Sequence, residues 1–163
     1  MRNIAVIATL LVFIVACSAK RKENPPDPAA LTVQEINAEL AKVSVVTFEY
    51  KSVALEKKEI AKWGEGVYPI IRDAIAKLPK GYVLQITGHA DASGPEDVTS
   101  DKRGNVYWST ERAMAAWQYL RGKGITSPQM TFKGVGSTDL IEGVDARDRR
   151  QRRITFKIIK EQQ

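Results

Sequence analysis

The sequence predicts an α/β domain in which helices pack on one face of a small mixed four-stranded sheet. Apolar and polar residues alternate in four short segments, and the segments between them carry apolar residues at helical spacing. Strands that alternate with helices, followed by one long final strand, are typical of a two-layer sandwich. With 163 residues, 44% of them hydrophobic and 27% charged, the chain can form one such core but not two.

The N-terminus has the pattern of an export signal. Arg2 precedes an apolar stretch over residues 4–16, which is too short to span a bilayer comfortably and has the length of a signal-peptide core. The stretch ends in the letters IVAC, and Cys17 is the only cysteine, which excludes an intrachain disulfide. This ending resembles a bacterial lipobox, which implies cleavage of a signal peptide (residues 1–16) and acylation of Cys17.

Residues 17–31 are polar and rich in proline, which predicts a flexible tether behind the acylated cysteine. A short helix is expected over residues 32–44. Thr32 and Glu35 have the spacing of a capping box. Val33, Ile36 and Leu40 share one helical face.

The folded domain is predicted to occupy residues 45–160. Its first strand covers residues 45–50, with Val46, Phe48 and Tyr50 on one side, and a helix follows between Leu55 and Leu78. The second strand is YVLQITG, with Leu84 and Ile86 facing inward.

A long loop separates this strand from the next helix, for which Ser109 is the expected N-cap. The buried stripe of that helix is expected to contain Ala113, Ala116, Trp117 and Leu120, and the helix to end at Gly122 and Gly124. The segments MTFKGVG and RITFKII are predicted as the third and fourth strands.

Charged residues at the two ends of the long loop indicate a binding site. Asp91 follows the second strand, and Glu111 and Arg112 are expected in the first turn of the next helix. Free backbone N–H groups of a helix start, together with a guanidinium, suit a carboxylate, and Asp91 suits an ammonium. The residues alone leave two interpretations open: a site for the zwitterionic end of an amino acid, or a surface pair between Asp91 and Arg112.

Four segments resemble the OmpA-like peptidoglycan-binding domain: ITGHADASG, NVYWSTERA, GVGSTD and RRQRRITFKI. The similarity covers about residues 45–160 and implies the family's two-layer sandwich. It also implies that Asp91 binds the amine and Arg112 the carboxylate of diaminopimelate in a peptidoglycan stem peptide. The motif positions place His89, Asn105 and Ser109 in a secondary part of that pocket.

The sequence departs from the family pattern in several places. The loop between Asp91 and Asn105 is longer than in most members, Trp108 replaces a leucine, and Gln151 stands where the last motif has asparagine. The residues before that motif, Arg147 and Asp148, do not match its usual Arg and Gly.

Other functional classes find little support. His89 is the only histidine, so ligation of a metal by paired histidines is excluded and a catalytic triad has one place to form. No acid lies in a motif that demands a paired carboxylate, so we expect no catalytic residues, metal or cofactor. The basic run from Arg147 to Arg153 would suit nucleic acid, but an exported protein does not meet it. Two interpretations stay open for this run: a charged approach to an edge strand, or contact with anionic wall polymer or lipid.

Together these observations predict a lipoprotein that links the membrane to the wall. The outer membrane is the expected location, because Ser18 is not the Asp that usually retains lipoproteins at the inner membrane. The expected partners are the peptidoglycan stem peptide and the membrane that holds the acyl groups of Cys17. An alternative is a surface-exposed adhesin or scaffold that uses the same fold to bind envelope or host proteins.

Overall fold

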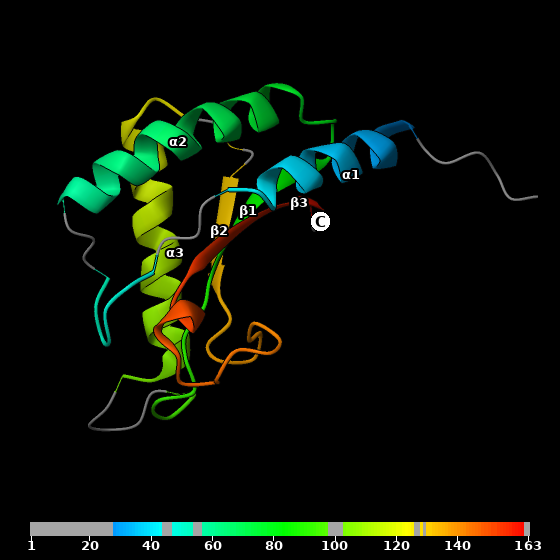
Figure 1. Ribbon diagram of the computed structural model, residues 1–163. Helices are drawn as coiled ribbons and strands as arrows, with labels where there is room; N and C mark the ends of the chain where they lie inside the picture. Colours follow the sequence, from blue (N-terminus) through cyan, green and yellow to red (C-terminus); the bar gives the residue numbers. More distant parts are fainter. Residues whose placement is uncertain are drawn as a thin grey trace, which may run out of the picture.

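The computed structural model describes residues 28–43, 47–53, 57–97, 103–125, 128 and 130–161. Figure 1 shows the elements in chain order. They are α1 (Pro28–Leu40), α2 (Lys57–Ala76), β1 (Tyr82–Gly88), α3 (Asn105–Gly122), β2 (Met130–Gly134), the short 3-10 helix η1 (Arg149–Gln151) and β3 (Ile154–Lys160). The predicted signal peptide, the acylated Cys17 and most of the tether lie outside the described residues. None of the described helices is both long and apolar enough to cross a bilayer.

The three strands form a mixed sheet with the order β2-β1-β3. β1 runs parallel to β2, with Leu84 opposite Met130, and antiparallel to β3, with Leu84 also opposite Ile158. The central strand carries the most deeply buried positions, since Leu84 and Ile86 are both fully buried. The inward-facing positions predicted for β1 are therefore confirmed.

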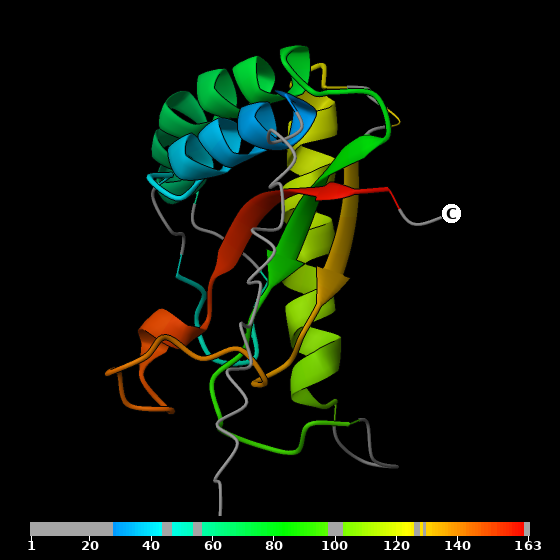
Figure 2. The same ribbon diagram turned by 90° about the vertical axis from the view of Figure 1, so that its right-hand side faces the viewer.

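The helices cover one face of this sheet and one of its edges. Figures 1 and 2 show α3 running along the sheet and α2 lying across the C-terminal end of α3. α3 contacts β1 and β2, whereas α1 packs against β3 and α2. The core between these layers includes Ile71, Ala113 and Leu120. The predicted two-layer α/β sandwich is confirmed.

α3 approaches the sheet closely where β1 and β2 end. Gly88 and Gly134 are paired neighbours there. A Cβ on Gly88 would lie 1.9 Å from the carbonyl oxygen of Ser109, and one on Gly134 would lie 2.3 Å from the backbone nitrogen of Thr110. Only glycine permits this approach, which brings Arg112, one turn further along the helix, to the end of β1.

The described sheet has three strands instead of the predicted four. Residues 47–50, the described part of the expected first strand, are not in a strand, and Val46 lies outside the described residues. Phe48 is buried as expected, but Tyr50 is 51% exposed. The backbone N–H of Phe48 bonds to the carbonyl of Arg152, which precedes β3, and the chain then turns at Lys51 with a φ of 50°.

Two helices begin earlier than predicted. α1 starts at Pro28, which suits the first helical position. Thr32 therefore lies inside the helix, where its hydroxyl donates to the carbonyl of Pro28, and residues 28–31 are helical instead of part of a tether. α3 begins at Asn105 with Gly104 as its N-cap, so the expected cap at Ser109 is wrong.

α1 is fastened to the free edge of β3 by one side chain. The amide nitrogen of Asn37 donates to the carbonyl of Ile158 at 3.1 Å, and its amide oxygen accepts the N–H of Ile158 at 2.7 Å. The side chain thus pairs with the strand edge as a neighbouring strand would. This contact covers part of an edge that would otherwise be open to other chains.

Candidate functional site

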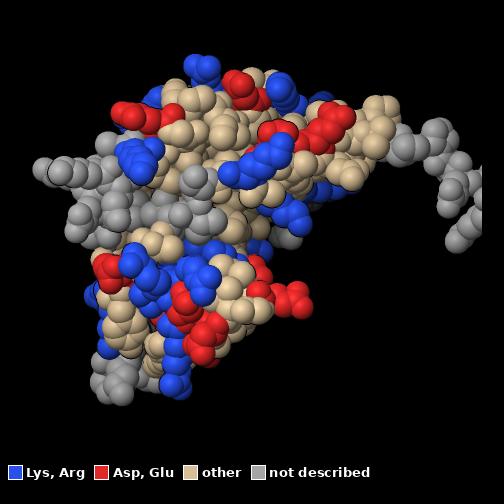
Figure 3. Space-filling model, in the orientation of Figure 1, with Lys and Arg blue, Asp and Glu red and all other residues tan. Residues whose placement is uncertain are grey.

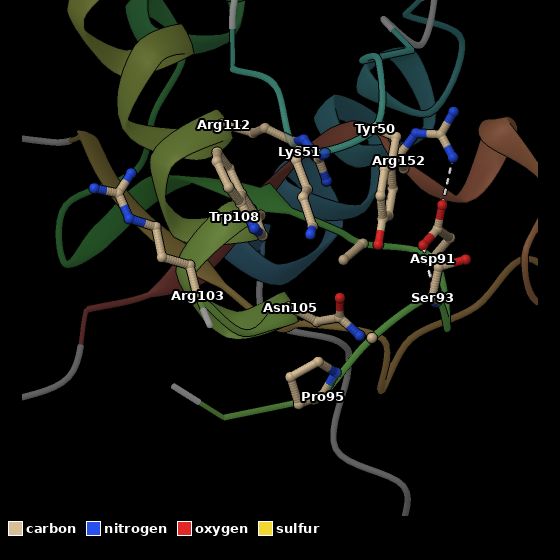
Figure 4. Close-up of a pocket in the computed structure, with 12 residues that line it drawn as sticks. Tyr50, Lys51, Asp91, Ser93, Pro95, Arg103, Asn105, Trp108, Arg112 and Arg152 are labelled. Atoms are coloured by element: carbon tan, nitrogen blue, oxygen red, sulfur yellow. Dashed lines mark hydrogen bonds and ion pairs between the residues drawn. The ribbon is translucent and has the colours of Figure 1, made fainter. Parts of the chain in front are cut away.

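A pocket of about 170 Å³ lies beyond the carboxyl end of β1 (Figure 4). Both Asp91 and Arg112 line it, so the structure brings the two predicted ligand-binding side chains to one hollow. The other lining residues come from four parts of the chain: Tyr50, Lys51, Ala90, Ser93, Gly94, Pro95, Arg103, Asn105, Trp108 and Arg152.

Arg112 is 1% exposed, and it lies two turns into α3 instead of in the first turn. Its guanidinium donates to three main-chain carbonyls: Ser52 through Nε at 3.2 Å, His89 through Nη1 at 3.0 Å and Glu49 through Nη2 at 3.3 Å. Burial, followed by the nearby charge of Arg152, lowers the pKa of Arg112 to about 10, so it stays cationic at neutral pH. A guanidinium has five N–H donors, so within the described part of the chain two of them, on the terminal nitrogens, are left for a ligand.

Asp91 is 2% exposed and takes part in an ion pair. One carboxylate oxygen accepts the backbone N–H of Ser93 at 2.9 Å, and the other accepts a hydrogen bond from Nη1 of Arg152. Asp91 therefore pairs with Arg152, and the sequence alternative in which it pairs with Arg112 is wrong. Each carboxylate oxygen retains accepting capacity for a ligand amine.

The two buried arginines together hold the segment 47–53 against the site. Arg152 donates through Nε to the carbonyl of Phe48 at 2.7 Å, while Arg112 binds the carbonyls of Glu49 and Ser52 and lies 5.4 Å from the centre of the Phe48 ring. This arrangement makes Tyr50 and Lys51 one wall of the pocket. Sequence reasoning assigned no functional role to either residue or to Arg152.

The basic run before β3 divides into buried and exposed members. Arg152 and Arg153 are buried, and Arg153 donates to the carbonyl of Asp139 at 3.1 Å. Arg149 and Arg150 in η1 are exposed, and Figure 3 shows Lys and Arg side chains gathered with acidic ones on the lower part of this face. Only the exposed members can act as a charged approach to an edge strand or meet an anionic partner.

The start of α3 is occupied by the chain itself. The backbone N–H groups of Asn105 and Val106 donate to the carbonyls of Pro95 and Glu96 at 2.8 and 3.0 Å. Gly104 lies so close that a Cβ would be 2.4 Å from the carbonyl carbon of Asp97. The expectation that free N–H groups at this helix start receive a ligand carboxylate is wrong for these two groups.

Glu96 joins the long loop to the loop after β2. Its carboxylate accepts the backbone N–H and the hydroxyl of Ser137 at 2.9 and 2.6 Å, and it accepts the side-chain amide of Asn105 at 3.4 Å. Gly136 gives it room, because a Cβ there would lie 1.5 Å from a carboxylate oxygen. The described part of the long loop thus shapes the rim of the pocket.

Of the three predicted secondary residues, only Asn105 lines the pocket. Ser109 is fully buried, donates to the carbonyl of Val106 and accepts the backbone N–H of Gly136 at 2.9 Å. His89 is also buried, with Nδ1 3.2 Å from the carbonyl oxygen of Asp139 and Nε2 2.9 Å from the hydroxyl of Thr155. Burial and then the charge of Arg153 lower the pKa of His89 to about 4. A neutral imidazole therefore joins the end of β1 to Asp139 and to Thr155 of β3.

Gln151, the departure from the motif's asparagine, is fully buried and lies away from the pocket. Its side-chain oxygen accepts the N–H of Ile141 at 2.7 Å, and its nitrogen donates to carbonyls that include those of Val144 and Asp145. Gln151 therefore organises the loop between β2 and η1. Within the described ranges no three His, Cys, Asp or Glu side chains are grouped so as to hold a metal.

The two-layer α/β fold thus places an acid at a strand exit and a buried arginine on the following helix around one pocket. The family model described as the OmpA family matches residues 47–153, and the chain belongs to that family. No curated protein sequence matches the chain at a significant level.

Solved structures show the same fold. The peptidoglycan-associated lipoprotein from Burkholderia pseudomallei is 18% identical with a TM-score of 0.55, covering 78% of this chain and 99% of that one. The C-terminal domain of Helicobacter pylori MotB is 20% identical with a TM-score of 0.54, covering 74% and 88%. The OmpA-like domain of FopA1 from Francisella tularensis is 22% identical with a TM-score of 0.52, covering 72% and 70%.

Proposed function

We propose that this protein is an outer-membrane lipoprotein that binds the diaminopimelate of peptidoglycan stem peptides non-covalently and so links the membrane to the wall. The observation that carries the proposal is the convergence of Asp91 and Arg112 on one hollow, with hydrogen-bonding capacity remaining on both. Membership of the OmpA family and the fold of a peptidoglycan-associated lipoprotein support it.

The ligand in this proposal is the zwitterionic end of diaminopimelate. Its carboxylate binds the remaining N–H groups of Arg112, and its ammonium binds Asp91, which it shares with Arg152. Each charge-assisted contact contributes about 1.5–3 kcal/mol before the costs of binding are subtracted. Affinity for one stem peptide is therefore modest.

Anchoring makes such a weak module effective. The lipobox ending at Cys17 supports an acyl anchor, and Ser18 supports sorting to the outer membrane. A domain held beside a polymer that repeats its ligand experiences an effective concentration of about a millimolar or more. Many copies then attach the membrane to the wall collectively, although each copy binds and dissociates.

The test is retention of the full-length chain, purified in detergent, on isolated wall sacculi. We expect retention that free diaminopimelate abolishes, and a loss of about tenfold or more in affinity for Asp91→Asn, which keeps the shape of the side chain but removes its charge. Arg150→Met, which removes an exposed arginine outside the pocket, serves as the control and should bind normally. Retention that neither diaminopimelate nor Asp91→Asn reduces would refute the proposal.

A further inference from the structure

The pocket carries more positive charge than a zwitterion requires. Four basic side chains, those of Lys51, Arg103, Arg112 and Arg152, line it, and among the described lining residues Asp91 is the only acid. An amine with its carboxylate adds no net charge, so three positive charges remain uncompensated when such a group is bound. This excess favours a ligand with a further anionic group.

Lys51 is placed to meet that group. It is the one residue other than glycine with a positive φ in the described part of the chain, at 50°. A side chain held in this region of backbone space costs free energy, and such positions persist where the surroundings enforce them. Here the surroundings are the bonds from Arg112 to the carbonyls of Glu49 and Ser52, on either side of Lys51.

The orientation of the side chains separates Lys51 from Arg103. Figure 4 shows the Lys51 ammonium pointing into the hollow between Trp108 and Tyr50, whereas the Arg103 guanidinium points outward. The Arg103 guanidinium lies over the ring of Tyr107, at 4.6 Å from its centre. Lys51 also lies near a ring, 5.3 Å from the centre of Tyr50, but Tyr50 lines the hollow, whereas Tyr107 does not. Arg103 therefore has the same charge at the same rim but points away from the ligand.

Trp108 forms the wall of the hollow beside Lys51 (Figure 4). Its indole nitrogen is buried and does not open onto the hollow. The Lys51 ammonium is therefore the donor that a carboxylate on this side of the pocket would meet.

We infer that Lys51 binds a second carboxylate of the ligand, so that the pocket selects stem peptides in which that carboxylate is free and not amidated. This inference rests on the proposed function. A stem peptide that ends at diaminopimelate offers two such groups: the carboxylate at the other end of diaminopimelate and the α-carboxylate of the preceding D-glutamate. The chemistry is the same for both, and the test separates them.

The test measures the affinity of the full-length chain in detergent for L-Ala–γ-D-Glu–diaminopimelate by calorimetry. Two further peptides each carry one amide, either on the D-glutamate α-carboxyl or on the diaminopimelate carboxyl nearer the peptide chain. We expect one of the two amides to weaken binding to the wild type about three- to fivefold, the upper part of the range for an exposed ion pair, and thereby to identify the group. Lys51→Met should bind all three peptides with equal, reduced affinity, while Arg103→Met should keep the preference.

The inference is overturned if the wild type binds all three peptides equally, or if Arg103→Met loses the preference as completely as Lys51→Met does. Either result leaves the proposed function standing, because sacculus binding and competition by diaminopimelate are unaffected. Absence of binding to every peptide and to sacculi would instead remove the proposed function and this inference with it.

Discussion

Single residues in this molecule decide whether the helix that carries Arg112 reaches the end of the sheet. Gly88 and Gly134 lie side by side under α3, and the space for a side chain at either is filled by helix backbone. Such contacts differ from contacts with flexible side chains, because a helix backbone moves only as a unit. The glycines in the predicted strand ends thus set the geometry of the site.

Gly88→Ala should lower the free energy of unfolding by about 2–3 kcal/mol, because the new methyl group would overlap the carbonyl of Ser109. Urea titration followed by circular dichroism measures the change. Gly66→Ala is the matched control, since nothing lies within 4 Å of a Cβ there, and in mid-helix it should stabilise by about 0.5–1 kcal/mol. Equal stabilities for Gly88→Ala and the wild type would contradict the close approach.

The roles of residues whose partners are distant in the chain could not be predicted from the sequence. Asp91 and Arg112 were found because they stand in motifs, but the partner of Asp91 is Arg152, which lies 61 positions away along the chain. Nothing local distinguishes that arginine from the exposed Arg149 or Arg150. Lys51 was missed for the same reason, since its place in the wall depends on two arginines from other elements.

Elements were predictable to the extent that their signals are local. The alternation of apolar residues predicted β1 over residues 82–88, as observed. The predicted start of α3 was wrong, because the first N–H groups of the helix donate to the carbonyls of Pro95 and Glu96. Such a cap, made by another segment, has no signal in the neighbouring sequence. The strand expected at residues 45–50 is missing from its described part, residues 47–50, where Phe48 is deeply buried without belonging to a strand.

The contact between α1 and β3 gives a prediction for elements. Asn37→Ala leaves the N–H and C=O of Ile158 without their partners and should lower the free energy of unfolding by about 1–3 kcal/mol. Hydrogen exchange should show the amide of Ile158 losing protection. Thr32→Ala, which removes a hydroxyl bonded only within α1, should leave that amide protected. An unchanged exchange rate in Asn37→Ala would mean that another group covers this edge.

The whole molecule should respond to acid through one buried imidazole. The pKa of His89 is lowered to about 4 in the folded protein from an ordinary value of 6.5. Between these values the unfolded chain binds a proton that the folded chain does not, so the free energy of unfolding falls as the pH falls from 6.5 to 4. The full difference corresponds to about 3 kcal/mol.

Urea midpoints of the wild type and of His89→Gln, measured between pH 7 and pH 4, check this expectation. The wild type should lose stability across the window, and the variant, although less stable at pH 7, should lose much less. The depressed pKa of Asp148, about 2, acts at lower pH and does not enter the comparison. Parallel curves for the two proteins would show that His89 does not govern the response.

The pairing of Asn37 with Ile158 has a mechanical consequence. Ile158 lies opposite Leu84, toward the start of β1, whereas the pocket opens beyond the far end of that strand. If the N-terminus is held by a membrane and the pocket by the wall, a pull that enters β3 at Ile158 reaches the pocket by two routes: along β3 to Arg152, or across to β1 and on to Asp91. The second route loads the ladder between β1 and β3 in shear, so that its backbone bonds resist together instead of opening one at a time.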